Sequence, residues 1–107
     1  GRIGERVFVP GANCFGAVRG LFGGAASRLV VPSRRVVTVD ETLGEQAVLL
    51  ALAATAQHAI AVAKGGVPEL VIGHGVLGRL LGRLAAIQGG PVTVWELDAT
   101  RRGGALG

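Results

Sequence analysis

Three glycines and one acid have the types and the spacing of a dinucleotide-binding site. Gly73, Gly75 and Gly78 form the pattern Gly-x-Gly-x-x-Gly, and Glu96 follows 18 residues after Gly78. The first glycine of such a site permits a tight turn, the second lets a pyrophosphate approach the backbone, and the third lets a helix and a strand pack closely. The acid accepts hydrogen bonds from the adenosine ribose and repels a 2′-phosphate. The spacing therefore predicts a site for NAD. Val76 and Leu77, in the first turn of the helix that follows the glycines, are expected to be part of this site.

The elements around the glycines have the order that such a site requires. Residues 70–72 are a short apolar run, typical of a buried parallel strand. Apolar residues then recur at helical spacing as far as Ile87, and Gly89-Gly90-Pro91 is expected to end this helix. The free N–H groups at the start of the helix suit a diphosphate. Residues 92–95 are the next strand, with the acid at its tip; a plain strand–helix–strand turn without a ligand is the alternative.

Several side chains near the turn have two interpretations. His74 either faces the cofactor phosphates or the cleft, or is an exposed residue of the turn. Asp98 is either a second ribose contact or a solvated loop acid. Arg101 and Arg102 could accommodate a 2′-phosphate, but with Glu96 present NAD remains the expected cofactor.

Three other residues are expected to be structural. Trp95 should pack in the core, and His58 should be a core histidine bonded to a backbone carbonyl. Cys14 should be a small buried apolar residue, because no partner base lies near it in sequence.

The composition bounds the class of protein. Of the 107 residues, 50% are hydrophobic and 17% are charged, so the chain can bury a core. The net charge is +4, but ten of the eleven cations are scattered arginines and only 4% of residues are aromatic, which argues against nucleic acid. The single cysteine excludes an internal disulfide and a cysteine-built metal site. The apolar run 47–56 is too short to span a bilayer and the start does not resemble a leader, so we expect a soluble, cytoplasmic protein.

The chain changes character near Asp40. Residues 6–11 read as a strand closed by a Pro-Gly turn, and the β-branched runs 28–32 and 35–39 read as two further strands, so residues 1–40 are expected to be antiparallel β structure. Thr42 and Glu45 have the spacing of a capping box.

A long helix, apolar all round and hence buried, is expected from this box to about Lys64. The expected divisions are therefore 1–40, 41–66 and 67–107. One strand–helix–strand unit cannot cover both faces of its sheet, so we expect an internal fragment of a larger enzyme.

A β lobe, a buried helix and a glycine turn in this order resemble the medium-chain dehydrogenase/reductase superfamily. The resemblance is carried by Gly4–Val7, which is similar to the family's "GDRV" strand, by residues 26–37, similar to its "AEYvvvP..rvv" hairpin, and by residues 52–60, similar to its "tAyhAl" interdomain helix. It implies a partial α/β fold: the end of a GroES-like antiparallel β lobe, an interdomain helix, and the first βαβ unit of a Rossmann fold. It also implies that Thr55 lies near the nicotinamide carboxamide, although this hydroxyl could equally bond its own helix backbone.

Four segments sharpen the resemblance: residues 6–14, 19–23, 49–56 and 73–81. They resemble members that oxidise the 3-(1-hydroxyethyl) group of a bacteriochlorophyllide to 3-acetyl with NAD, in bacteriochlorophyll a biosynthesis. The implied partners are a bacteriochlorophyllide-type chlorin and, through the rest of the Rossmann half, a second copy of the chain. The alternatives are a zinc-free NADPH quinone or enone reductase and a non-catalytic NADH-sensing module. Zinc-dependent members carry Cys or Glu where this chain has Ala51, so no metal is expected, and the sequence identifies no catalytic base.

Overall fold

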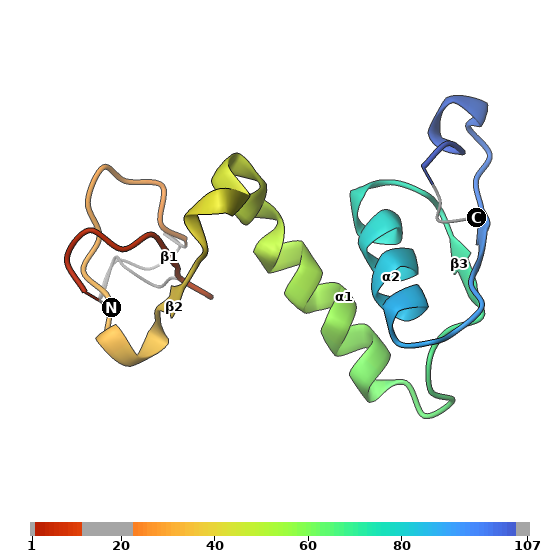
Figure 1. Cartoon of the computed structure of the whole chain (residues 1–107), viewed down its shortest axis with the longest axis horizontal. Coiled ribbons are helices and arrows are strands. Elements are labelled where there is room, and N and C mark those ends of the chain that lie inside the picture. The colour runs from red at the N-terminus through yellow and green to blue at the C-terminus, as the bar shows by residue number, and fades with distance from the viewer. Residues whose placement is uncertain (1, 12–22, 105–107) are drawn as a thin grey trace. The chain divides into compact units, whose positions relative to one another are not determined.

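The computed structural model describes residues 2–11 and 23–104, and the chain divides into two compact units, residues 1–48 and 49–107 (Figure 1). Cys14 and most of the glycine-rich run 16–25 lie outside the described residues, so the prediction for Cys14 stays a prediction.

The first unit contains a short antiparallel pair. β1 (Val7–Phe8) pairs with β2 (Val37–Thr38), with Val7 opposite Thr38. The N–H of Val39 extends the pairing by donating to the carbonyl of Arg6 at 2.9 Å. Antiparallel β structure in the first forty residues is thus confirmed.

The run 28–32, by contrast, is not a strand, and that prediction was wrong. It forms an exposed loop in which Val30 is 93% exposed, and it leads into the 3₁₀ helix η1 (Ser33–Arg35). Pro32 has no N–H to give to a neighbouring strand, and its carbonyl instead accepts from the N–H of Arg35 at 2.9 Å. A proline followed by a helical turn therefore outweighs the β-branched composition here.

The predicted long helix begins in a different way from the one expected. Its first part is the 3₁₀ segment η2 (Glu41–Leu49), interrupted at Gly44, where φ is 51° and ψ is −130°. The capping-box prediction was wrong, because Asp40 does the capping: its Oδ1 accepts from the backbone N–H of Thr42 at 2.8 Å and from the Thr42 hydroxyl at 2.7 Å. These bonds lower the pKa of Asp40, the side-chain bond contributing most. A short acid two residues ahead is well placed for such a turn, so Thr42 acts as the donor.

The α-helical part is α1 (Leu50–Val62). The segment 41–62 has a mean hydropathy of 1.2 and, by length and composition alone, could cross a membrane. Its 13 α-helical residues rise only about 20 Å, however, against about 30 Å for a hydrocarbon core. This segment is therefore weak evidence for a membrane span.

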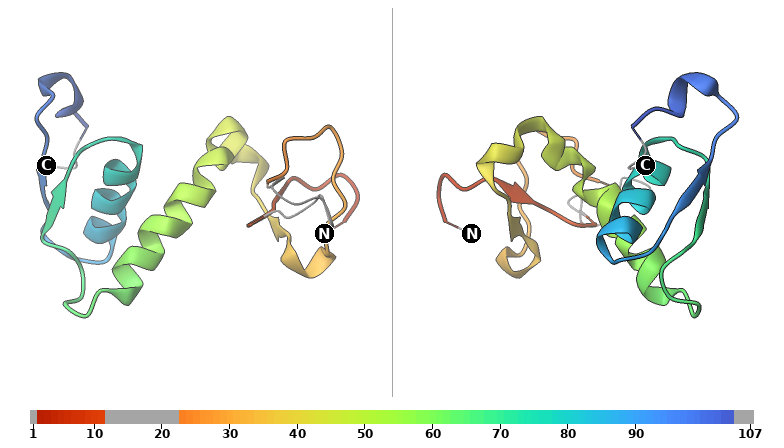
Figure 2. Two further views of the ribbon diagram at one scale, coloured as in Figure 1. Left: turned by 180° about the vertical axis from the view of Figure 1, so that it is seen from behind. Right: turned by 45° about the vertical axis from the view of Figure 1, so that its right-hand side comes forward.

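The second unit contains a parallel strand–helix–strand arrangement, as predicted. β3 (Leu70–Ile72) pairs in parallel with β4 (Thr93–Trp95), and α2 (Val76–Ile87) connects them. Figures 1 and 2 show α2 lying between α1 and the strands. Val71 is buried beneath α2, and Ala56 of α1 and Ala85 of α2 are fully buried where the two helices pack.

The predicted end of α2 is also confirmed. Gly89 has φ +87°, and its N–H donates to the carbonyl of Ala86 at 3.0 Å. The N–H of Gly90 reaches the carbonyl of Ala85 at 3.2 Å, which completes a Schellman motif.

Three predictions of burial were wrong within the part of the chain that the structure describes. Of the residues of α1, only Ala56 and Ile60 are buried. His58 lies on its exposed surface, and Trp95 is 61% exposed. Among the described elements, only α2 packs against α1, so most of the surface of α1 stays exposed. Trp95 lies on the face of the strands opposite α2, where Ile72 is also exposed.

Candidate functional site

The glycine turn joins β3 to α2, and two of its glycines have the structural roles that the spacing predicts. Gly73 has φ +94°, a conformation that side chains other than hydrogen strongly disfavour, and its N–H donates to the carbonyl of Trp95 at 2.7 Å. A Cβ on Gly78 would collide with the carbonyl oxygen of Gly73 and lie 2.9 Å from its carbonyl carbon. Helix and strand can therefore approach this closely only if residue 78 is glycine.

The middle glycine leaves the start of α2 open. Gly75 is the N-cap residue of α2 and has no side chain that could cap the helix. Apart from Gly75 itself and its two chain neighbours, no described residue has an atom within 4 Å of the position that a Cβ on Gly75 would take. Val76 and Leu77, the first helical residues, are 53% and 38% exposed. Uncapped N–H groups at a helix start, with open space before them, are the environment that a diphosphate prefers.

Glu96, directly after β4, faces this turn. Its Oε2 accepts from the backbone N–H of His74 at 2.7 Å, and its Oε1 accepts from the N–H of Asp98 at 2.9 Å. These two bonds, with that from Asp98 contributing most, hold the pKa of Glu96 below its ordinary value, so the side chain is a carboxylate at neutral pH.

The carboxylate of Glu96 retains acceptor capacity for a ligand. Each carboxylate oxygen has two lone pairs, and the contacts above occupy one on each. A cavity of about 300 Å³ adjoins the acid, lined by His74, Val94, Trp95, Glu96 and Arg102. A pair of neighbouring hydroxyl groups could donate to this acid from the cavity.

The interpretation of His74 as an exposed residue of the turn was wrong, whereas its contact with the cofactor phosphates stays a prediction. Its side chain is only 3% exposed, and its Nδ1 lies 2.6 Å from the carbonyl oxygen of Arg101. A carbonyl oxygen only accepts, so Nδ1 carries the proton. The imidazole is turned into the loop after Glu96, and the contribution of His74 to the turn is its backbone N–H.

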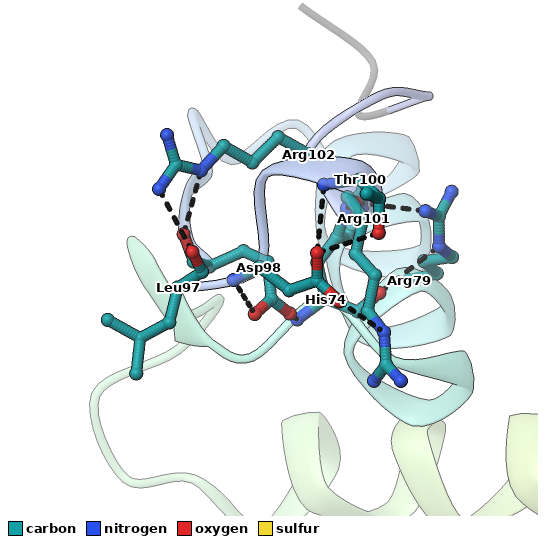
Figure 3. Close-up of polar contacts among 8 residues, drawn as sticks. His74, Arg79, Leu97, Asp98, Thr100, Arg101 and Arg102 are labelled. Carbon is teal, nitrogen blue, oxygen red and sulfur yellow. Dashed lines mark hydrogen bonds and ion pairs between the residues drawn. The ribbon is translucent and has the colours of Figure 1, made fainter.

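The loop Leu97–Arg102 closes over this imidazole, and Figure 3 shows its polar contacts. Asp98 precedes a 3₁₀ turn (Ala99–Arg101) and accepts from the N–H of Thr100 at 2.9 Å and from its hydroxyl at 2.6 Å. These bonds, the side-chain bond first, lower the pKa of Asp98. The acid also pairs with Arg101 at 3.3 Å, so the structure places it as an exposed loop acid.

Both arginines of this loop fold back on the chain. Arg101 is held in its ion pair with Asp98, while Arg102 donates to the carbonyls of Glu96 at 2.9 Å and of Leu97 at 3.1 Å. The sequence prediction missed a third arginine, Arg79, which joins α2 to this loop. No local pattern could have revealed this link, because the carbonyl of Arg101 lies 22 residues away along the chain and is brought near Arg79 only by the fold.

Thr55 bonds its own helix, which is one of the two interpretations left open for it. Its Oγ1 donates to the carbonyl of Ala51 at 3.1 Å. Within residues 2–11 and 23–104, no three His, Cys, Asp or Glu side chains are grouped so that they could hold a metal ion.

Two curated proteins are similar to the chain over nearly its whole length. One is the 2-desacetyl-2-hydroxyethyl bacteriochlorophyllide A dehydrogenase of Rhodobacter capsulatus, which is 55% identical over 99% of this chain. The other is the enzyme of the same name from Cereibacter sphaeroides, 54% identical over 99% of this chain. The resemblance to bacteriochlorophyllide dehydrogenases is confirmed.

The chain spans about a third of the length of these curated relatives, 34% and 35% respectively. No protein-family model matches the chain. No solved structure matches it either.

Proposed function

We propose that the protein carrying this sequence is an NAD-dependent dehydrogenase that oxidises the 3-(1-hydroxyethyl) group of a bacteriochlorophyllide to 3-acetyl, in bacteriochlorophyll a biosynthesis. The names of the two relatives support the substrate and the reaction class. The observation that carries the cofactor assignment is the contact of Glu96 with the glycine turn, 2.7 Å from the N–H of His74.

The relatives' names describe a chlorin that has a hydroxyethyl substituent in place of acetyl. Its conversion to acetyl removes two electrons and two protons: a hydride leaves the carbinol carbon for NAD⁺, and the hydroxyl proton passes to a base or to solvent. The cofactor supplies the redox chemistry, and the protein binds and orients. The residues of the proposed site bind the cofactor, and they do not identify the base.

Each part of the proposed cofactor site rests on a feature of this chain. Gly73, Gly75 and Gly78 shape the turn, and the diphosphate is assigned to the backbone N–H groups of Val76 and Leu77 at the start of α2. The free lone pairs of Glu96 are assigned to the adenosine ribose hydroxyls. The contact of His74 with the phosphates stays a prediction, and Thr55, whose oxygen can still accept, is assigned to the carboxamide.

We also propose which part of a larger dehydrogenase fold each segment of the chain forms. The parallel strand–helix–strand unit of residues 67–107 fits the start of a Rossmann domain, residues 41–66 fit an interdomain helix, and the antiparallel pair of residues 1–40 fits the end of a GroES-like lobe. The proposed enzyme is cytoplasmic, acts without a metal in this part of the chain, and forms a homo-oligomer through the rest of the Rossmann half.

The direct test is turnover. The intact protein that carries this sequence is incubated with NAD⁺ and the hydroxyethyl bacteriochlorophyllide, and the NADH formed and the chlorin absorption spectrum are recorded together. We expect NADH and acetyl chlorin in equal amounts. Binding of NADH without turnover would favour the sensing module, and a preference for NADPH of about tenfold (1.4 kcal/mol) would favour the quinone or enone reductase.

A further inference from the structure

The carbonyl oxygen of Arg101 accepts two hydrogen bonds, one from the glycine turn and one from α2. One comes from Nδ1–H of the buried His74 at 2.6 Å, and the other comes from the guanidinium of Arg79 on α2 at 2.9 Å. Arg79 also donates through Nε to the carbonyl of His74 at 3.1 Å. One guanidinium thus ties the glycine turn to the loop that follows Glu96.

We propose that Arg79 and His74 are specificity-determining positioning residues, which hold the loop Leu97–Arg102 in the arrangement that selects NAD over NADP. We call the three bonds made by these two side chains to the carbonyls of Arg101 and His74 the loop lock. This inference rests on the proposed function, because it concerns the adenosine end of the same nucleotide site.

The first consequence of the loop lock concerns the acid. Glu96 is fixed from both sides, by the N–H of His74 in the turn and by the N–H of Asp98 in the loop. If the loop moves away, the bond from Asp98 is lost and the carboxylate keeps one of its two anchors. A carboxylate that is less well fixed is a poorer acceptor for two ribose hydroxyls at once.

The second consequence concerns the cations of the loop. While the loop is locked, Arg102 donates hydrogen bonds to the carbonyls of Glu96 and Leu97, and Arg101 forms an ion pair with Asp98. Figure 3 shows Arg79 reaching the loop from α2, while the guanidinium of Arg102 lies over Leu97. These contacts lie within residues 96–102 and do not hold the loop in place, so a released loop can move both arginines toward a 2′-phosphate, which would then compete for their guanidinium groups. A 2′-phosphate is the group that arginines after this strand accommodate in NADP sites.

The geometry requires arginine at position 79. The two acceptors of Arg79 belong to different segments, and its planar guanidinium reaches one with Nε and the other with a terminal nitrogen. A lysine places a single ammonium group and cannot reproduce this fork, although it keeps the charge. The variant Arg79→Lys, which keeps the charge but loses the planar guanidinium, therefore tests whether the shape of the side chain is needed.

The test measures the dissociation constants of NADH and NADPH for the intact protein and for its variants Arg79→Met and Arg79→Lys. In both variants we expect NADH to bind about tenfold more weakly and NADPH to change little or to gain, so that the preference for NADH shrinks by about tenfold. Arg83→Met is the matched control, since Arg83 lies one turn further along α2, is exposed and has no part in the loop lock. It removes the same charge and should leave the preference unchanged.

A second measurement uses the unsubstituted protein alone, without nucleotide, and so does not depend on whether a variant folds. A long-range ¹H–¹⁵N spectrum of the unsubstituted protein should show the ring of His74 protonated at Nδ1, because that atom faces a carbonyl oxygen. A ring protonated only at Nε2 would overturn the loop lock. So would an unchanged NADH/NADPH ratio in Arg79→Met and Arg79→Lys, or an equal loss of preference in Arg83→Met. If the unsubstituted protein binds neither nucleotide, the proposed function itself fails, whatever the ring tautomer, and the specificity role fails with it.

Discussion

Replacing Gly78 by alanine tests whether the close approach of α2 to the glycine turn is structural. Alanine at a helix-interior position gains about 1 kcal/mol over glycine from intrinsic propensity. Here, however, the new Cβ would collide with the carbonyl oxygen of Gly73 and sit 2.9 Å from its carbonyl carbon. These are backbone atoms, so the contact cannot be relieved by a side-chain rotation, and overpacking of this kind costs about 1–3 kcal/mol. With the upper part of that range, the net loss is about 1–2 kcal/mol of unfolding free energy.

The same substitution at Gly82 provides the matched control. Gly82 lies on the same helix, and its Cβ would meet only Val94 Cγ2 at 3.7 Å, an ordinary contact. Gly82→Ala should therefore keep the propensity gain and stabilise the protein by about 0.5–1 kcal/mol. Urea unfolding of the two variants and the unsubstituted protein gives both numbers. If Gly78→Ala proved as stabilising as Gly82→Ala, the close packing of helix on turn would be refuted.

Two further substitutions test the turn and the loop. In Gly73→Ala the new Cβ would meet nothing beyond its chain neighbours within 4 Å, so the substitution should lower the unfolding free energy only by the cost of holding φ at +94°, about 1–2 kcal/mol. Thermal or urea unfolding measures this loss, and a loss near zero would show that the turn is not left-handed. Asp98→Ala should lower Tm at neutral pH, because the bonds from Thr100 to Asp98 are lost. The pKa of Asp98 is lowered in the folded state, so this stability is present above its ordinary pKa of about 3.9 and disappears as the pH falls through the lowered value. The two melting curves should therefore converge in acid, and a Tm difference that does not depend on pH would contradict the capping role.

The sequence predicted those features that depend on neighbouring residues. The conformation of Gly73 and the C-terminal glycines of α2 follow from the backbone angles that only glycine adopts easily. The parallel order of β3 and β4 follows from the length of the connection, because a helix between two strands returns the chain in the same direction.

The features that the sequence did not predict depend on what lies opposite a residue. Trp95 and His58 were expected in the core by residue type, and both face outward on surfaces that no described element covers. His74 was expected to be accessible by its position in the motif, yet a loop more than twenty residues later covers it, with its ring 2.6 Å from the Arg101 carbonyl. Arg79 joins that loop through the carbonyl group of Arg101. Every residue has a carbonyl group, so a pattern of residue types does not predict such a bond.

We propose above that Glu96 and the glycine turn bind the adenosine half of NAD. The most direct measurement is calorimetric titration of ADP-ribose into the intact protein, into Glu96→Ala, and into Glu69→Ala as a control that removes an exposed acid before the opposite end of β3. We predict that ADP-ribose binds the unsubstituted protein and the control equally, and binds Glu96→Ala about tenfold more weakly, because its ribose hydroxyls lose their acceptor. Equal affinity for all three proteins, or no binding to any of them, would contradict the account.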